Sequence, residues 1–255
     1  MILLNRDEDM ENRFIRNIWI DWTKIARDSY LRDIPALQFA APLTLNRNVT
    51  FFIGENGSGK STLLEAVAVA YGFNPEGGSK NYNFSTYDSH SELHQALQLT
   101  RGAVIPRGSY FLRAESFYNV ASKAEEYRDG DPLEVYYDRY GGKSLHQQSH
   151  GESFLALMQN NFAAKGIYLL DEPEAALSPQ RQLTLLLHIN QLAEDGAQFI
   201  IASHSPILLG LPDAQILSFD DGEIKSCAYE QTGSYQVTEM FINNREYFLE
   251  RLLNS

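Results

Sequence analysis

Eight consecutive residues of this chain could grip a phosphate group. Residues 54–61 match the pattern G-x-x-x-x-G-K-[ST] in full. Its glycines let the backbone curl so that successive N–H groups point at one anion, and a helix starting there adds a favourable field. In this pattern Lys60 reaches the β- and γ-phosphates, and Ser61 binds Mg²⁺. The phosphate-contacting residues that we expect are Gly54, Glu55, Asn56, Gly57, Ser58, Gly59, Lys60, Ser61 and Thr62.

The flanking sequence suits such a loop. Residues 49–53 are apolar and β-branched and predict a buried strand that runs straight into Gly54. Residues 61–71 are strong helix formers, and Gly72 is a natural C-terminal cap. This strand, loop and helix order favours a phosphate-binding loop over an ordinary glycine turn.

Two adjacent carboxylates, Asp171 and Glu172, follow a second apolar strand at residues 167–170. We expect Asp171 to hold Mg²⁺ through water, and Glu172 to accept a proton from an attacking water or to orient it. Taken alone, a strand followed by two acids is as often a solvated strand end. Together with the glycine loop, it predicts the second half of a triphosphate-hydrolysing site.

A histidine, His204, follows a third apolar strand at residues 198–202. A lone histidine in such a place is more often structural. We expect this strand to lie beside the one that ends at Asp171, which would bring His204 to the same sheet edge as the phosphates. A γ-phosphate contact is therefore the favoured interpretation.

With these motifs the chain resembles an ABC-type ATPase head of the P-loop NTPase superfamily. The sequences of its motifs resemble most those of the stand-alone SMC-, RecF- and OLD-like AAA-family ATPases. Residues 148–152, Gln-Ser-His-Gly-Glu, resemble the family signature Leu-Ser-Gly-Gly-Gln. The resemblance implies that Ser149 and Gly151 complete the nucleotide site of an opposite subunit in a head-to-tail dimer. From the residues alone, Ser149 is a helix N-cap with Glu152 closing a capping box, and both interpretations can hold at once.

Two segments depart from the family pattern. Residues 172–179 resemble the D-loop stretch, but Ser178 stands where an aspartate is usual, which leaves subunit communication open. The strand at 110–114 leads into Glu115, where the Q-loop would have a glutamine. Glu115 could ligate Mg²⁺ through water, and an acid at a helix start is an equally good interpretation.

The base-binding part of the site is poorly defined by the sequence. Tyr30 and Phe39 are candidates for stacking on adenine, although a packing role is favoured for each. There is no Asn-Lys-x-Asp or Thr-Lys-x-Asp run that would recognise guanine. The expected cofactors are therefore ATP and Mg²⁺.

The order of elements predicts an α/β fold, with a mostly parallel sheet flanked by helices and an antiparallel β part. We expect one domain over residues 1–255, with a core of 1–73 and 149–255 and an inserted, partly helical lobe at about 74–148. The expected strands are 14–22, 49–53, 110–113, 167–170, 198–202, 215–219 and 223–229. The expected helices are 61–71, 92–99, 152–161, 180–193 and an amphipathic one at 237–253.

Composition restricts location and partners. The 33 acidic and 21 basic residues give a net charge of −12, which opposes broad contact with nucleic-acid phosphates, so a DNA partner stays open but unsupported. The single cysteine, Cys227, cannot form an internal disulfide, and the N-terminus lacks a signal-peptide pattern. The longest apolar stretch, 200–211, is far shorter than the roughly 20 residues of a membrane span. We expect a cytoplasmic protein without direct membrane insertion.

The favoured function is Mg²⁺-dependent ATP hydrolysis through an ATP-sandwiched homodimer, in a non-transport role such as DNA maintenance or phage defence. An effector or partner protein of unknown identity is implied. The main alternative is the ATP-binding subunit of a membrane transporter, which Glu115 at the Q-loop position disfavours. A regulatory switch is a third interpretation. A small-molecule kinase is the weakest, because it leaves the signature-like segment and His204 unexplained.

Overall fold

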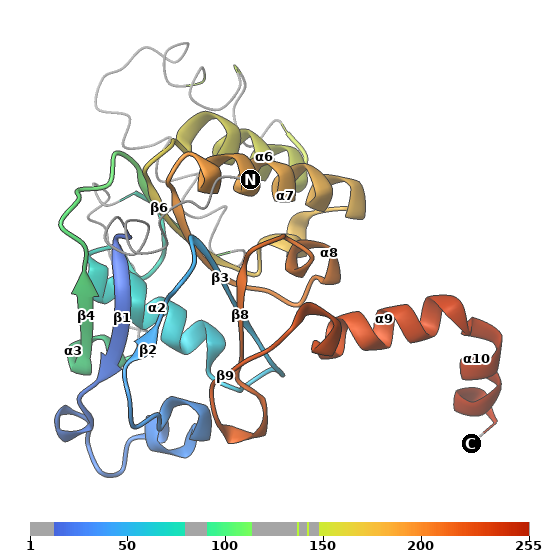
Figure 1. Ribbon diagram of the computed structural model, residues 1–255, viewed down its shortest axis with the longest axis horizontal. Helices are drawn as coiled ribbons and strands as arrows, with labels where there is room; N and C mark the ends of the chain where they lie inside the picture. The colour runs from blue at the N-terminus through green and yellow to red at the C-terminus, as the bar shows by residue number, and fades with distance from the viewer. Residues whose placement is uncertain (1–12, 80–90, 114–136, 138–141, 143–147, 255) are drawn as a thin grey trace, which may run out of the picture.

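The computed structural model describes residues 13–79, 91–113, 137, 142 and 148–254. This part of the chain contains two β-sheets (Figure 1). One helix packs between the two sheets, and further helices cover the other face of the larger sheet. No helix among these residues combines the length and the hydropathy that crossing a bilayer requires.

The larger sheet has six strands and is mostly parallel. Its order is β5 (Ser109–Arg113), β6 (Ile167–Asp171), β7 (Gln198–Ala202), β3 (Val49–Ile53), β8 (Gln215–Ser218) and β9 (Lys225–Ser226). The first five strands run parallel, whereas β9 runs antiparallel to β8. Every residue of β3, β6 and β7 is buried, as is typical of a parallel sheet covered on both faces. The expected α/β fold class is confirmed.

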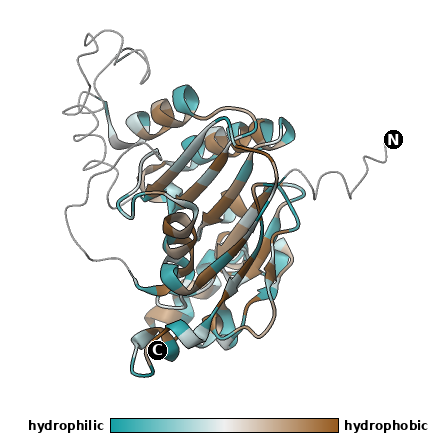
Figure 2. Cartoon of the chain, turned by 90° about the vertical axis from the view of Figure 1, so that its left-hand side faces the viewer, coloured by the Kyte–Doolittle hydropathy of each residue, from teal (hydrophilic) through white to brown (hydrophobic). Residues whose placement is uncertain are grey.

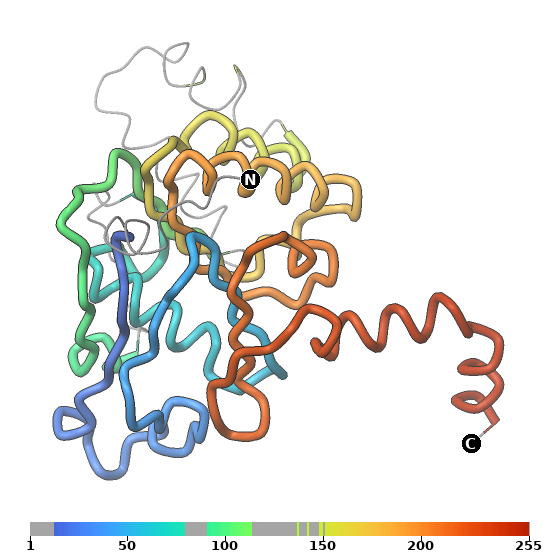
Figure 3. The backbone as a smooth tube through the Cα atoms, viewed as in Figure 1, coloured from blue at the N-terminus to red at the C-terminus, as the bar shows by residue number. Residues whose placement is uncertain are grey.

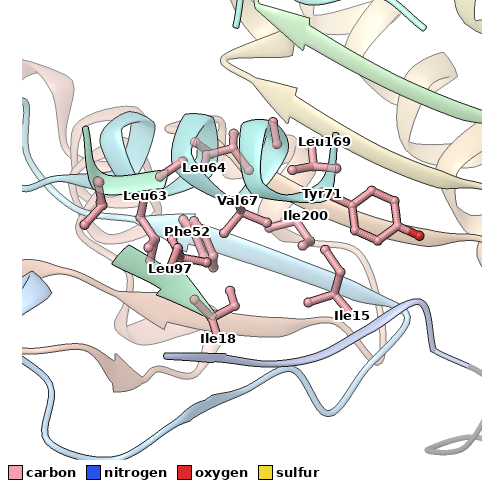
Figure 4. Packing of buried hydrophobic residues seen from close by; sticks show 14 of the residues in the cluster. Ile15, Ile18, Phe52, Leu63, Leu64, Val67, Tyr71, Leu97, Leu169 and Ile200 are labelled. Atoms are coloured by element: carbon pink, nitrogen blue, oxygen red, sulfur yellow. The ribbon is translucent and has the colours of Figure 1, made fainter. Parts of the chain in front are cut away.

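One helix, α2 (Lys60–Tyr71), lies between the larger sheet and a smaller antiparallel one. The smaller sheet has the order β2 (Leu43–Thr44), β1 (Ile15–Ile20) and β4 (Leu97–Arg101). Apolar side chains of α2 and both sheets form one buried cluster, and its labelled members in Figure 4 include Leu63, Val67, Phe52, Ile200 and Ile18. This packing fixes the direction in which the N-terminus of α2 points.

The opposite face of the larger sheet is covered by three helices. They are α6 (His150–Asn161), α7 (Pro179–Glu194) and α8 (Pro206–Leu209). A second buried cluster joins this face of the sheet to these helices, with Phe154 and Leu185 packed in the same cluster as Phe199. Figure 2 shows the apolar strands in the interior and polar residues on the outer faces of the helices.

The C-terminal helices, α9 (Gly233–Asn243) and α10 (Arg245–Leu253), extend away from the two sheets (Figure 3). Each of their residues is exposed or half-buried. The remaining elements are short: α3 (Leu93–Ala96) and the 3₁₀ helices η1 (Trp22–Lys24), η2 (Tyr30–Asp33), η3 (Pro35–Leu37), η5 (Pro173–Ala176), η6 (Asp220–Gly222) and η7 (Tyr229–Gln231).

The predicted helix at 92–99 is wrong in its second half. Only α3 is helical, and residues 97–101 form β4, which pairs with β1. Leu97 and Leu99 alternate with exposed residues, and they lie opposite Ile20 and Ile18 of β1. Cross-strand packing against a half-buried sheet therefore outweighs the local preference for a helix.

The C-terminal region also differs from the prediction. The single helix expected at 237–253 is two helices, which break at Asn244, where φ is −134°. The strand expected at 223–229 contracts to β9, although its antiparallel pairing with β8 is as predicted. Of the expected lobe at 74–148, β4 and β5 belong to the two sheets, while most of residues 114–147 lie outside the described residues.

Candidate nucleotide-binding site

The glycine loop connects β3 to α2 as the sequence predicts. Gly54, Gly57 and Gly59 have φ angles of 138°, 83° and 101°, conformations that residues with a Cβ rarely adopt. At Gly59, the N-cap of α2, a Cβ would lie 2.8 Å from Ile34 Cγ2. All three glycines are thus required by conformation, and Gly59 also by close packing.

Lys60 folds back across the loop that precedes it. Its Nζ donates hydrogen bonds to the carbonyl oxygens of Gly54 (2.6 Å) and Glu55 (2.7 Å). Lys60 is buried, and this desolvation lowers the pKa of the ammonium, while nearby carboxylates, Glu172 foremost, oppose the shift. A cation is therefore held at the loop within reach of an incoming phosphate.

The carboxyl end of β6 meets the start of α2 at the position expected for a metal. Ser61 Oγ donates a hydrogen bond to Asp171 Oδ1 at 2.9 Å. Arg113, at the end of β5, lies 3.9 Å from Asp171 Oδ2 through its Nε and pairs with Glu65. Hydroxyl and carboxylate oxygens are the donors that Mg²⁺ prefers, and it uses one or two protein oxygens together with substrate phosphates and water. The Ser61 and Asp171 pair fits that ion.

Within the described residues, no cluster of three or more His, Cys, Asp or Glu side chains could hold a metal by itself. A protein-only cage for a cation is therefore absent from this part of the chain. Mg²⁺ bound as a nucleotide complex needs no such cage, because the phosphates supply part of its coordination shell.

Glu172 and His204 lie on one cavity, as expected from the order of the strands. β6 and β7 are neighbours with Asp171 opposite Ala202, and Glu172 N donates to Ala202 O at 2.9 Å. Both Glu172 and His204 border a cavity of about 1160 Å³ that the loop residues 54–58 also line. The predicted neighbourhood of the two strands is confirmed.

The rest of the cavity lining was not predicted. It includes Pro35, Ala36, Phe219, Asp220, Asp221, Gly222, Gly233, Ser234 and Val237. The described residues that line the cavity include neither Tyr30 nor Phe39. Tyr30 is 58% exposed, and Phe39 packs against the cluster between the sheets.

Asp220, the first residue of η6, anchors the glycine loop. Its Oδ1 accepts a hydrogen bond from Glu55 N at 3.0 Å, and its Oδ2 accepts one from Ser218 Oγ at 2.9 Å. A carboxylate thus holds the outer part of the loop in place. No spacing rule in the sequence connects Asp220 to residues so far upstream.

The signature-like segment starts α6 and carries the predicted capping box. Glu152 Oε2 accepts hydrogen bonds from Ser149 N (3.0 Å) and Ser149 Oγ (2.7 Å). The Ser149 hydroxyl is the main cause that lowers the pKa of Glu152. Arg181 of α7 adds bonds from Nη1 to Ser149 Oγ (3.2 Å) and from Nη2 to Glu152 Oε1 (3.0 Å). A Cβ at Gly151 would lie 2.8 Å from the backbone oxygen of Ala176, so a glycine is needed there.

Four predicted site residues have not yet been placed in the structure: Ser149, Gly151, Thr62 and Glu115. Ser149 and Gly151 are not among the described residues that border the cavity. Thr62 is half-buried in the first turn of α2. Glu115 lies outside the described residues.

Two protein-family models match the chain. A model described as an AAA domain matches residues 29–135, which include the glycine loop. A second AAA-domain model, whose description mentions the AbiEii toxin of a type IV toxin–antitoxin system, matches residues 145–210, from Ser149 past Asp171 to His204. Together the two matches span more than half of the chain. The chain is a P-loop ATPase domain of the ABC/AAA type.

Curated relatives of this ABC/AAA-type domain are distant. The ribose import ATP-binding protein RbsA of Bacillus cereus is 25% identical over 82% of this chain and 45% of its own length. Protein McbF of Escherichia coli is 25% identical over 60% of this chain and 62% of its own length. The chain therefore spans less than two thirds of each. Among solved structures, the ADP conformation of MJ1267, an ATP-binding cassette of an ABC transporter, has a TM-score of 0.47 at 17% identity over 79% of this chain and 91% of its own.

One further residue of the ABC/AAA-type site was missed by sequence reasoning. Glu174 Oε1 accepts hydrogen bonds from Ser203 Oγ, His204 N and Ser205 N. The only hint in the sequence is a third acid directly after Asp171, Glu172 and Pro173, which is easily taken for a solvated turn. Its partners lie about thirty positions downstream, and only the fold brings them together.

Proposed function

We propose that this ABC/AAA-type domain binds ATP with Mg²⁺ and hydrolyses it slowly. The single observation that carries the proposal is the hydrogen bond from Ser61 Oγ to Asp171 Oδ1 at 2.9 Å, at the start of the helix that follows the glycine loop. It joins one hydroxyl and one carboxylate oxygen, which are donor types that Mg²⁺ prefers, and this supports a cation bound there together with the nucleotide. Glu172, the next residue, borders the adjacent cavity.

Each residue has a distinct part in this proposal. Ser61 and Asp171 would hold Mg²⁺, which supplies positive charge against the charge that develops on the phosphate oxygens. Lys60 donates to the β- and γ-phosphates, and Glu172 accepts a proton from the attacking water or orients it. His204 contacts the γ-phosphate from the end of β7.

The hydrolysis step is tested with Glu172→Gln, which keeps the shape of the side chain and removes the base. ATP should bind as tightly as in the parent, while phosphate release falls to the background rate. The matched control is Glu223→Gln, an exposed acid paired with Lys225, which should leave turnover unchanged. Undiminished phosphate release by Glu172→Gln would refute the role of this residue.

The proposed active form is a head-to-tail homodimer that sandwiches ATP. Ser149 is the N-cap of α6 and Gly151 lies in its first turn, where the free N–H groups of a helix favour an anion. In this proposal they lie opposite the nucleotide of a second subunit, as the resemblance to the family signature implies. The outer γ-phosphate oxygens would then be bound by two chains.

Light scattering with saturating ATP and Mg²⁺ tests the dimer. The Glu172→Gln chain should double its mass, because ATP is held without being cleaved. Adding Ser149→Arg should keep it monomeric, because the bulky side chain occupies the space that the γ-phosphate needs. The matched control is Gln159→Arg, an exposed position near the other end of α6. A Glu172→Gln chain that stays monomeric, or a Ser149→Arg double variant that still dimerises, would exclude this composite site.

We infer a non-transport role, and the description of the model that matches residues 145–210 supports it, since it refers to a toxin–antitoxin system. Transport is the second candidate, because RbsA and the arabinose protein AraG are both named import ATP-binding proteins. The neighbouring genes distinguish the two. A gene for a membrane-spanning permease would support transport, and a gene for a nuclease or another toxic effector would support defence.

A further inference from the structure

One carboxylate oxygen binds three consecutive residues of the loop that carries His204. Glu174 Oε1 accepts hydrogen bonds from His204 N at 2.5 Å, from Ser203 Oγ at 2.9 Å and from Ser205 N at 3.1 Å. Glu174 belongs to η5, directly after Glu172, whereas the three donors follow β7. Two segments that both border the nucleotide site are therefore joined through one side chain.

The surroundings of His204 show what this anchor controls. Ser203 and Ser205 are buried, at 0% and 5% exposure, whereas His204 is exposed and borders the cavity. Within the described part of the chain, no hydrogen bond holds the imidazole itself. Its starting position is therefore set by the backbone, and the backbone N–H of His204 is bound by Glu174.

The bonds to Glu174 are of the strong kind. A hydrogen bond that an ionised carboxylate accepts is roughly twice as strong as one between neutral groups. The second oxygen, Oε2, is buried and accepts no hydrogen bond from the described residues. Burying Oε2 without a hydrogen bond costs free energy. All of the described hydrogen bonds of this carboxylate go to the loop around His204.

We propose that Glu174 is a positioning residue that sets the distance between the His204 imidazole and the outer phosphate of the bound nucleotide. A displacement of η5, which also follows Glu172, would carry His204 with it. This inference rests on the proposed ATP hydrolysis. It adds a residue whose effect on turnover passes entirely through His204.

A double-mutant cycle tests this dependence. Glu174→Ala should lower the turnover rate about 10- to 100-fold at a nearly unchanged KM, since a misplacement on the order of 1 Å can have this effect. His204→Ala should lower turnover as well. The double variant should be no slower than His204→Ala alone, because the anchor then has nothing to position. Losses that multiply in the double variant would overturn the proposal.

Glu174→Gln keeps the experiment decisive if the alanine variant fails to fold. Its amide oxygen can replace Oε1 as a neutral acceptor, so the loss of turnover should be smaller than with alanine. That loss should also vanish in the His204→Ala background. A Glu174→Gln loss that persists without His204 would show an independent role and refute the inference.

The control variant is Gln182→Ala, at the other side of the same loop. Gln182 Oε1 accepts from Ser205 Oγ at 2.6 Å, so the variant removes a comparable contact without touching the His204 N–H. It should lower thermal stability and leave turnover within about twofold of the parent, as expected when no transition-state contact is lost. A turnover loss equal to that of Glu174→Ala would reduce Glu174 to a general stabiliser of the loop.

Binding measurements separate a failure of this inference from a failure of the proposed hydrolysis. If the parent shows no turnover, the proposed hydrolysis fails, and the ratio of ATP to ADP affinity becomes the measure of γ-phosphate contact. Glu174→Ala should then reduce ATP affinity and spare ADP affinity, as His204→Ala does. The positioning role would be refuted, and γ-phosphate contact by His204 kept, if the ratio of ATP to ADP affinity fell in His204→Ala but stayed unchanged in Glu174→Ala.

Discussion

Lys60→Met removes the ammonium from the glycine loop and keeps a side chain of similar length. In the structure, Nζ donates hydrogen bonds at 2.6 and 2.7 Å to the carbonyl oxygens of Gly54 and Glu55. Each bond from this charged group contributes about 1.5–3 kcal/mol, so losing both destabilises the fold by about 3 to 6 kcal/mol in total. Burial lowers the Lys60 pKa, so removing the charge returns part of that loss. We therefore expect the free energy of unfolding without nucleotide to fall by about 2 to 4 kcal/mol, less than the sum for the two bonds.

The effect on nucleotide binding should be much larger. A hydrogen bond to a charged group contributes about 1.5–3 kcal/mol, and Lys60 is the only side-chain cation that the loop motif supplies to the phosphates. One such bond to the β-phosphate and one to the γ-phosphate amount to at least about 3 kcal/mol. The dissociation constant for ATP with Mg²⁺ should therefore rise more than about 100-fold.

Titration calorimetry with ATP and Mg²⁺ measures this change, and Lys24→Met, at an exposed lysine, is the matched control. Thermal unfolding gives a second measure. Saturation at a hundred times the dissociation constant should stabilise the parent by about 2.7 kcal/mol, and the variant should lose nearly all of that gain at the same concentration. A variant that binds ATP within about threefold of the parent would refute the assignment of the phosphate site.

Three further outcomes follow from single contacts. Ser61→Ala removes the partner of Asp171, so the Mg²⁺ concentration for half-maximal turnover should rise about tenfold, while an unchanged Mg²⁺ titration would argue against the metal site. Glu152 has a pKa below its ordinary 4.5, so it stabilises the fold above pH 4.5 and loses this effect as the pH falls through the lower folded value. Glu152→Gln should therefore flatten that acid limb in denaturation at stepped pH, and an identical limb would contradict the linkage. Gln198→Leu strips the backbone of Ile15 of two buried hydrogen bonds and should cost about 2–4 kcal/mol by urea unfolding, whereas a loss under about 1 kcal/mol would argue against the bridge.

The parts of the site that the sequence could predict are those defined by neighbouring residues. The strands at 49–53 and 198–202 have the predicted bounds, because these largely apolar runs end at Gly54 and Ser203. The glycine loop follows from a local pattern of glycines and one lysine. The meeting of Asp171 with Ser61 required only the rule that parallel strands bring their carboxyl ends to one edge.

The parts that escaped prediction depend on contacts between distant residues. Asp220 holds Glu55, Glu174 holds His204, and Arg181 reaches Ser149, and no spacing rule connects the members of any pair. β4 was mistaken for helix for the same reason, since its partner strand lies about eighty residues upstream. Local patterns therefore predicted the candidate site residues, while the residues that position them came only from the fold.

The two proposed roles of Ser149 compete for the same atom, and this competition can be measured. Ser149 Oγ already donates its proton to Glu152 Oε2 at 2.7 Å, so it must give up that bond before it can donate to a partner's phosphate. The Glu152 carboxylate would also repel the phosphate, whereas Arg181 beside it would attract it. Removing Glu152 with alanine in the Glu172→Gln background should therefore tighten the ATP-dependent dimer in spite of a weaker helix cap. Sedimentation at graded protein concentrations measures this, and a dimer that is weaker than, or equal to, that of Glu172→Gln alone would mean that the cap does not compete with the composite site.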